Sequence, residues 1–205
     1  GLLITRGGIP PFVVTLATMK LYRSVTQHFM QGYNPRVPMQ FLGISNFQIG
    51  SFRVMPVIYW LLIAGVLYFV SKRSTFGRKI IAVGSNERSA NLSGVNVKKV
   101  KRRVYAITGL LVSFAAIIQV SRIGSMDYAN AGSGYEMEAI AAAVVGGTSM
   151  SGGRGTVIGT ILGVLIIAVM NNLLNLLGVP PFLREAFKGL ILIGAVLMQK
   201  KQKSV

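Results

Sequence analysis

Residues 71–103 read SKRSTFGRKIIAVGSNERSANLSGVNVKKVKRR, and this segment decides the fold that the sequence predicts. It holds ten Lys and Arg residues against one acid, Glu87, and lies between two apolar runs, residues 56–70 and 104–120. Apolar helices of about 20 residues match the hydrocarbon thickness of a bilayer. Short loops with an excess of Lys and Arg stay on the cytoplasmic side. We therefore expect the chain to span a membrane and residues 71–103 to face the cytoplasm.

The composition is typical of a polytopic helical membrane protein. Of 205 residues, 52% are hydrophobic, 13% are charged and 24 are glycine, which is more apolar than a soluble domain of this length needs. The net charge of +17 lies in loops between apolar runs, whereas nucleic-acid binding needs a basic face on a polar domain. The chain has no Cys and one His, His28. We therefore expect no nucleic-acid partner, no disulfide framework and no metal site.

Six apolar segments are predicted to cross the membrane. The tail lysines Lys200, Lys201 and Lys203 favour a cytoplasmic end, which requires an even number of crossings from a cytoplasmic start. Residues 135–150 supply the sixth crossing, although their apolar core, residues 139–145, is too short unless protein shields its ends. We predict an all-α transmembrane bundle in which this helix is short or broken. The predicted crossings are residues 9–29, 54–70, 104–120, 135–150, 156–177 and 182–198, with an external loop at residues 30–53.

The domain organisation follows from this topology. We predict a single transmembrane domain over residues 1–205, with residues 71–103 as its main cytoplasmic loop. The chain begins at Gly1 without Met, a charged leader or a cleavage signature. We expect it to be a fragment of a longer protein that has further spans at its amino end.

Glycines at four-residue spacing mark a packing face. Gly155, Gly159 and Gly163 form a smooth ridge if they share a helix, and small residues at this spacing let a second helix approach closely. The preceding loop, residues 146–155, resembles a phosphate-binding loop only superficially, because Gly153 stands where Lys is needed. We expect no nucleotide there and instead a tight turn between two helices at the cytoplasmic surface.

Few polar residues in or near the spans could carry chemistry. Glu136 and Glu138 are two positions apart and so lie on different helix faces, which argues against a paired-carboxylate enzyme and leaves no catalytic residue. Either acid could contact a polar solute or cap the short helix. Asn171, Asn172 and Asn175 lie late in an apolar helix, where amides either bond between helices or line a hydrated path. We take Glu136 and the three asparagines as candidate translocation-path residues.

The basic loop contains its own helix signals. Ser85 or Asn86 can cap a helix, Glu87 favours its positive amino end, and Gly94 can end it in a left-handed conformation. This helix either contacts another protein or lies on anionic lipid, which the lysines and arginines after it would also favour. The predicted helix comprises Ser85, Asn86, Glu87, Arg88, Ser89, Ala90, Asn91, Leu92, Ser93 and Gly94.

Several stretches together resemble the permease subunits of bacterial ABC importers for ribose and related monosaccharides. The resemblance covers essentially the whole sequence. The matching stretches are IPPFVVTL at 9–16, TFGR at 75–78, AVGSNERSANLSGVNVK at 82–98, GYEMEAIAA at 134–142, GGTSMSGGRG at 146–155 and NNLLNLLGV at 171–179.

The resemblance implies a set of partners. A second permease subunit, expected to be an identical copy, would complete the pathway, two ATPase subunits would lie beneath it, and an extracytoplasmic sugar-binding protein would dock outside. The helix at residues 85–94 would couple the permease to the ATPase, which would hold the ATP and Mg, so this chain would bind no cofactor. The resemblance also implies the cytoplasmic membrane of a bacterium, with a cytoplasmic carboxyl terminus.

Two function hypotheses remain. The first is the membrane-spanning subunit of an ATP-driven sugar importer that works by alternating access and is not itself an enzyme. The second is an ion-coupled secondary transporter of a small polar solute, which would need carboxylates buried at mid-span. The acids nearest a span, Glu136 and Glu138, lie at its end, so the sequence favours the importer.

Overall fold

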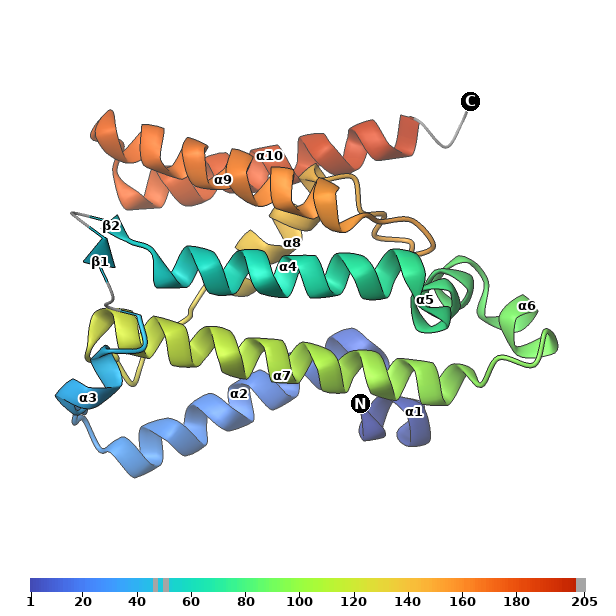
Figure 1. The fold of residues 1–205 in the computed structure, drawn as a ribbon, viewed down its shortest axis with the longest axis horizontal. Helices are drawn as coiled ribbons and strands as arrows, with labels where there is room; N and C mark the ends of the chain where they lie inside the picture. The colour runs from blue at the N-terminus through green and yellow to red at the C-terminus, as the bar shows by residue number, and fades with distance from the viewer. Residues whose placement is uncertain (46–47, 50–51, 202–205) are drawn as a thin grey trace. The chain divides into compact units, whose positions relative to one another are not determined.

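The computed structural model describes residues 1–45, 48–49 and 52–201, and its regular structure is almost entirely α-helical (Figure 1). This confirms the predicted all-α class. Two short strands, β1 (Gln48–Ile49) and β2 (Phe52–Arg53), pair antiparallel. The helices are α1 (Leu2–Gly7), α2 (Pro11–Met30), α3 (Met39–Leu42), α4 (Met55–Arg73), α5 (Thr75–Ser85), α6 (Glu87–Leu92), α7 (Val97–Ile123), α8 (Tyr135–Val145), α9 (Val157–Leu176) and α10 (Pro181–Lys201).

Each predicted crossing contains a helix, namely α2, α4, α7, α8, α9 or α10. Within the described residues, α4, α7 and α9 are long and apolar enough to span a membrane, and the count of six crossings stays a prediction. Residues 46–47 and 50–51 of the predicted external loop, and Lys203 of the tail, lie outside the described residues.

The boundaries of the basic segment differ from the prediction. Helix α7 begins at Val97 rather than at residue 104, because the side chain of Asn96 accepts a hydrogen bond from the Lys99 backbone N–H at 2.9 Å. This capping bond satisfies an amino-terminal donor and fixes the start of the helix. Most of the predicted loop is therefore helical, and the basic residues 98–103 belong to the first turns of α7.

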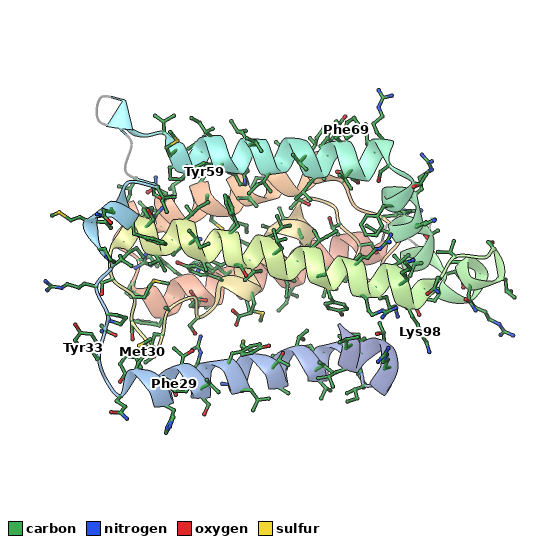
Figure 2. The ribbon with its side chains drawn as sticks, turned by 60° about the horizontal axis from the view of Figure 1, so that its bottom comes forward. Phe29, Met30, Tyr33, Tyr59, Phe69 and Lys98 are labelled. Carbon is green, nitrogen blue, oxygen red and sulfur yellow. The ribbon has the colours of Figure 1, made fainter. Side chains whose placement is uncertain are left out.

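The candidate spans bury little of their apolar surface within the chain. Only 0%, 6% and 11% of their most apolar stretches, in α4, α7 and α9, are buried. Figure 2 shows Phe29 and Phe69 projecting from their helices, and these side chains are 76% and 65% exposed. Apolar surface of this extent needs a cover of lipid or of further helices, as expected for a bundle in a membrane.

The chain packs as two compact units. The first comprises residues 1–63 and 96–132. In it, the buried hydroxyl of Ser121 on α7 donates to the carbonyl of Phe41 at 2.8 Å and accepts from the backbone N–H of Ser45 at 3.0 Å. Tyr59 of α4 meets Phe114 of α7 edge to face, with ring centroids 5.9 Å apart. These contacts tie α3 and the start of α4 to α7.

The second unit comprises residues 64–95 and 133–205. Its core lies where α8 meets α9 and α10 and contains Ala141, Ala142 and Ile167, with Val145, Met170 and Ile191 packed against them.

Backbone contact between α8 and α9 is unusually close. A Cβ at Gly163 would overlap the carbonyl of Ala142, and one at Gly159 would overlap the carbonyl of Gly146. Only glycine leaves room for this approach, the device that helices use to pack in lipid. Gly155, the third residue of the predicted ridge, precedes α9 and lies against Thr148 in the loop instead.

We expect Gly163→Ala to destabilise the protein by about 1–3 kcal/mol, because the added methyl group would force α8 and α9 apart. The matched control is Gly194→Ala in α10, where a Cβ would meet nothing within 4 Å. This control should be neutral or stabilising by up to about 1 kcal/mol. Thermal unfolding of the purified full-length protein in detergent measures both changes, and equal midpoints for the two variants would contradict the role given to Gly163.

Candidate functional site

The first candidate site is the helical corner of α5 and α6. At the start of α5, the hydroxyl of Ser74 accepts a hydrogen bond from the backbone N–H of Gly77 at 3.0 Å. At its end, the backbone N–H of Asn86 donates to the carbonyl of Ala82, while the side chain of Asn86 accepts from the backbone N–H of Ser89 at 3.0 Å. One residue thus ends α5 and begins α6, which makes the corner short and fixes its angle.

The predicted helix at residues 85–94 corresponds to α6, Glu87–Leu92. Asn86 is the cap, whereas Ser85 belongs to α5. Gly94 has φ +79°, and the backbone N–H of Val95 donates to the carbonyl of Ala90 at 3.0 Å. A left-handed glycine with such a hydrogen bond is a common carboxyl-terminal cap of a helix.

Helix α6 presents most of its surface to the outside of its unit. Ala90 is buried, whereas Arg88 is exposed and Leu92 is 82% exposed. Arg88 and Leu92 are four positions apart and so lie on the same side of α6. The corner is therefore a small, firmly capped surface that exposes one cation and one large apolar side chain.

The second candidate site is a polar cluster where α8, α9 and α10 meet. The ammonium of Lys188 donates to Glu138 at 2.5 Å and to Glu185 at 2.8 Å. The guanidinium of Arg184 donates through Nη1 to the side-chain oxygen of Asn175 at 3.0 Å. Lys188 is only 18% exposed, so its charge is satisfied by protein rather than by solvent.

The structure brings some of the predicted path residues together and leaves others apart. Asn175 joins the cluster through Arg184, and Asn171 places its buried Oδ1 without a hydrogen-bond partner among the described residues. Asn172 is exposed, and so is Glu136. Of the two neighbouring acids, it is Glu138 that bonds to α10.

Sequence reasoning did not select Arg184 or Lys188. The available signal was the presence of charges inside the apolar segment 182–198, together with the spacing of Glu185 and Lys188 by three residues, which suits a pair on one helix face. Nothing local indicated that Glu138, 50 positions before Lys188, is the closer partner.

The hollow beside this cluster is small. Its volume is about 100 Å³, and its lining is Met137, Glu138, Ala141, Ile167, Glu185, Lys188 and Gly189. Sites for small organic ligands are usually about 300–1,000 Å³. In this conformation, the cluster therefore acts as a polar tie that holds the short helix α8 to α10.

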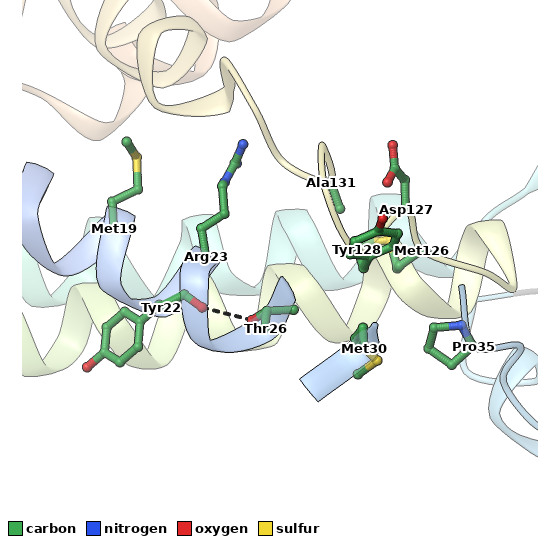
Figure 3. Close-up of a pocket in the computed structure, with 10 residues that line it drawn as sticks. All are labelled: Met19, Tyr22, Arg23, Thr26, Met30, Pro35, Met126, Asp127, Tyr128 and Ala131. Atoms are coloured by element: carbon green, nitrogen blue, oxygen red, sulfur yellow. Dashed lines mark hydrogen bonds between the residues drawn. The ribbon is translucent and has the colours of Figure 1, made fainter. Parts of the chain in front are cut away.

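A larger hollow lies in the first unit, beside the end of α2 and the segment after α7. Its volume is about 420 Å³, which falls in the range of ligand sites. Figure 3 shows Met19 and Arg23 extending from α2 on the same side as Asp127. The lining is Met19, Tyr22, Arg23, Thr26, Met30, Pro35, Met126, Asp127, Tyr128 and Ala131.

Asp127 organises the turn beside this hollow. Its carboxylate accepts from the backbone N–H of Ala129 at 2.8 Å and from the side-chain amide of Asn130 at 3.0 Å. These hydrogen bonds favour the ionised form and, with a smaller contribution from Arg23, lower the pKa of Asp127 below its ordinary value of 3.8. The lining of this hollow therefore contains a negative charge at Asp127 and a positive charge at Arg23.

Comparison with known proteins identifies the family. Residues 1–196 match the family described as "Branched-chain amino acid transport system / permease component". The chain belongs to this permease family.

The permease is also similar to curated bacterial sugar permeases, which confirms the resemblance predicted from its motifs. It is 43% identical to the ribose import permease protein RbsC of Bacillus subtilis, over 100% of this chain and 64% of that protein. It is 38% identical to RbsC of Escherichia coli K12, over 99% of this chain and 64% of that protein. It is 38% identical to the galactose/methyl galactoside import permease protein MglC of the same strain, over 97% of this chain and 61% of that protein.

The chain spans less than two thirds of the length of these relatives. No solved structure matches the permease.

We expect the two carboxylates that bind Lys188 to contribute unequally to stability. Glu138→Gln should lower the stability of the full-length permease by about 1–2 kcal/mol, because a partly buried ammonium loses a charged acceptor. Glu185→Gln is the matched control, since Glu185 is 68% exposed and Glu138 is 35% exposed, and exposed ion pairs contribute about 0–1 kcal/mol. Unfolding in detergent measures both variants, and a larger loss for Glu185→Gln would contradict this account.

The pKa of Asp127 predicts a pH-dependent contribution to stability. Because the folded-state pKa is lowered, the contribution is present above the ordinary value of 3.8 and is lost as the pH falls through the folded-state pKa. Asp127→Asn should therefore lower the unfolding midpoint at about pH 7, and the difference should shrink as the pH falls below 3.8 and through the folded-state pKa, where Asp127 becomes protonated. A difference that stayed constant over this range would exclude the carboxylate charge as its cause.

Proposed function

We propose that the permease is the membrane-spanning subunit of an ATP-driven importer of a monosaccharide. The observation that carries this proposal is the identity of 38–43% to ribose import permeases along essentially the whole chain. The capped corner of α5 and α6 supports it, because an importer subunit without its own nucleotide site needs a firm surface for the ATPase.

The substrate class rests on the relatives. The family description names branched-chain amino acids, whereas the similar curated proteins are named for ribose and for galactose or methyl galactoside. We infer a small, uncharged, polyhydroxylated solute and favour a ribose-type sugar. The first unit's hollow of about 420 Å³ has room for such a solute.

The proposed mechanism is alternating access. ATP closes a pair of ATPase subunits, the α6 helices seated on them move with them, and the permease helices tilt so that the central cavity changes side. ATP and Mg are held by the ATPase, and no covalent step falls to this chain, so the permease itself is not an enzyme. Asn171, Asn172, Asn175 and Glu136 stay candidates for the path.

The proposed assembly contains a second permease subunit, expected to be an identical copy, an ABC ATPase and an extracytoplasmic sugar-binding protein. The little-buried apolar surfaces of α4, α7 and α9 support contacts with other spans and with lipid. We place the protein in the cytoplasmic membrane of a bacterium, with residues 71–103 and the carboxyl terminus in the cytoplasm.

An ion-coupled secondary transporter is the second candidate. The ion pair of Glu138 and Lys188 between apolar helices favours it, because ionisable pairs of this kind occur in proton and ion relays. The small size of the adjacent hollow, about 100 Å³, favours a structural tie instead.

The test is ATP-dependent sugar uptake by proteoliposomes that contain the full-length permease and the ATPase encoded beside it. We expect uptake of ribose or a related sugar to require ATP on the ATPase side and to survive ionophores that collapse ion gradients. Replacement of residues 87–92 by a Gly-Ser linker should abolish ATPase co-purification, because the docking helix is lost.

The control replaces Lys20 by Met, which removes an exposed charge on α2 and should leave ATPase binding unchanged. Uptake that needs an ion gradient and no ATP would contradict the importer and support the secondary transporter.

A further inference from the structure

The loop between α8 and α9 lies directly against the end of α5. A Cβ on Gly84, in the last turn of α5, would fall 2.7 Å from the backbone nitrogen of Gly153. A Cβ on Gly152 would fall 2.5 Å from the carbonyl oxygen of Gly84, and one on Gly153 would overlap the side chain of Ser85. Gly84 thus meets Gly152 and Gly153 backbone to backbone, and Gly153 also lies against Ser85, so the two segments are in close contact.

The loop itself is closed by its own hydrogen bonds. The N–H of Ser149 donates to the carbonyl of Arg154 at 2.9 Å, and the N–H of Gly152 donates to the carbonyl of Ser149 at 3.0 Å. The N–H of Thr148 bonds back to Ala143 in α8 at 2.9 Å. Backbone bonds within so short a segment resist deformation, so a force on Gly152 and Gly153 reaches the ends of the two helices.

Each of the two segments in this contact belongs to a larger rigid element. On one side, Gly146 and Gly159 lock α8 to α9 by backbone contact. On the other side, Asn86 joins α5 to α6 in a single residue and caps both. Packed elements of this kind move as bodies rather than bend.

We propose that the contact of Gly84 with Gly152 and Gly153 is the joint through which movement of α6 reaches the α8–α9 pair. Residues 146–155 are then a second transmission element of the permease, besides the covalent link from α5 through Ser74 to α4. The joint carries the motion of the docking helix to the pair of helices that holds the polar cluster of Glu138 and Asn175. This inference rests on the proposed function, since it assumes that an ATPase moves α6.

The test uses the full-length permease with its ATPase in proteoliposomes and measures sugar transported per ATP hydrolysed. Gly84→Ala should keep ATPase binding and basal hydrolysis and lower transport per ATP by about fivefold or more, because the added methyl group displaces the loop from α5. Gly109→Ala is the matched control, since Gly109 is also helical and a Cβ there would meet nothing within 4 Å. It should transport like the wild type.

A second variant loosens the joint without a steric clash. Two glycines inserted after Met150, which is 65% exposed, lengthen the loop and let it yield under load. We expect the same loss of transport per ATP with normal ATPase binding, and this variant decides the matter if Gly84→Ala fails to assemble.

The outcomes separate the two proposals. If the wild type shows ATP-dependent uptake and the lengthened loop transports with the wild-type ratio, the joint is overturned and the importer stands. If the wild type shows no ATP-dependent uptake, the proposed function fails and the joint fails with it. Loss of coupling in the loop variant, with Gly109→Ala unaffected, supports both.

Discussion

Direct contact between backbones at glycine is the constraint on which the second unit depends. Helix α8 has only the residues Tyr135–Val145 and is too short to be stable by its own hydrogen bonds in water or to span a bilayer alone. It is held because Gly159 and Gly163 let α9 lie against its backbone, and Ala141 and Ala142 then form a core with Ile167. Larger residues at these positions would separate the helices and expose the polar groups at the ends of α8.

The polar cluster complements this packing. Once α8 is close to α9 and α10, Glu138 comes within hydrogen-bonding distance of Lys188, and Arg184 reaches Asn175. Ion pairs placed in apolar surroundings contribute little net stability, but they disfavour alternative positions, because breaking one leaves a charge unpaired. The apolar contacts therefore supply most of the attraction, and the charged contacts select the register of α8 against α10.

The α5–α6 corner and the loop at residues 146–155 belong to the same chain of contacts. Glycines again permit the approach, at Gly84, Gly152 and Gly153. The same device therefore occurs at both the helix pair and the corner.

Local patterns in the sequence were enough to predict the positions of most helices. Apolar runs located the helices α2, α4, α7, α9 and α10, since hydrophobic length is a property of contiguous residues. Asn86, Glu87 and Gly94 located α6, because caps act on the nearest backbone groups. The start of α7 was missed, because the basic residues after Asn96 indicated a loop although Asn96 caps a helix. The motifs also determined the permease family.

The tertiary structure alone decided which residues meet. It joined Glu138 rather than Glu136 to Lys188, brought Gly84 against Gly152, and left Gly155 outside α9. These pairings depend on the approach of segments that are far apart in the sequence, and the energy of such an approach is set by three-dimensional shape. The sequence by itself therefore determined the helices and their class, whereas the tertiary structure decided the contacts between them, through glycine packed against backbone and through polar pairs such as Glu138 and Lys188.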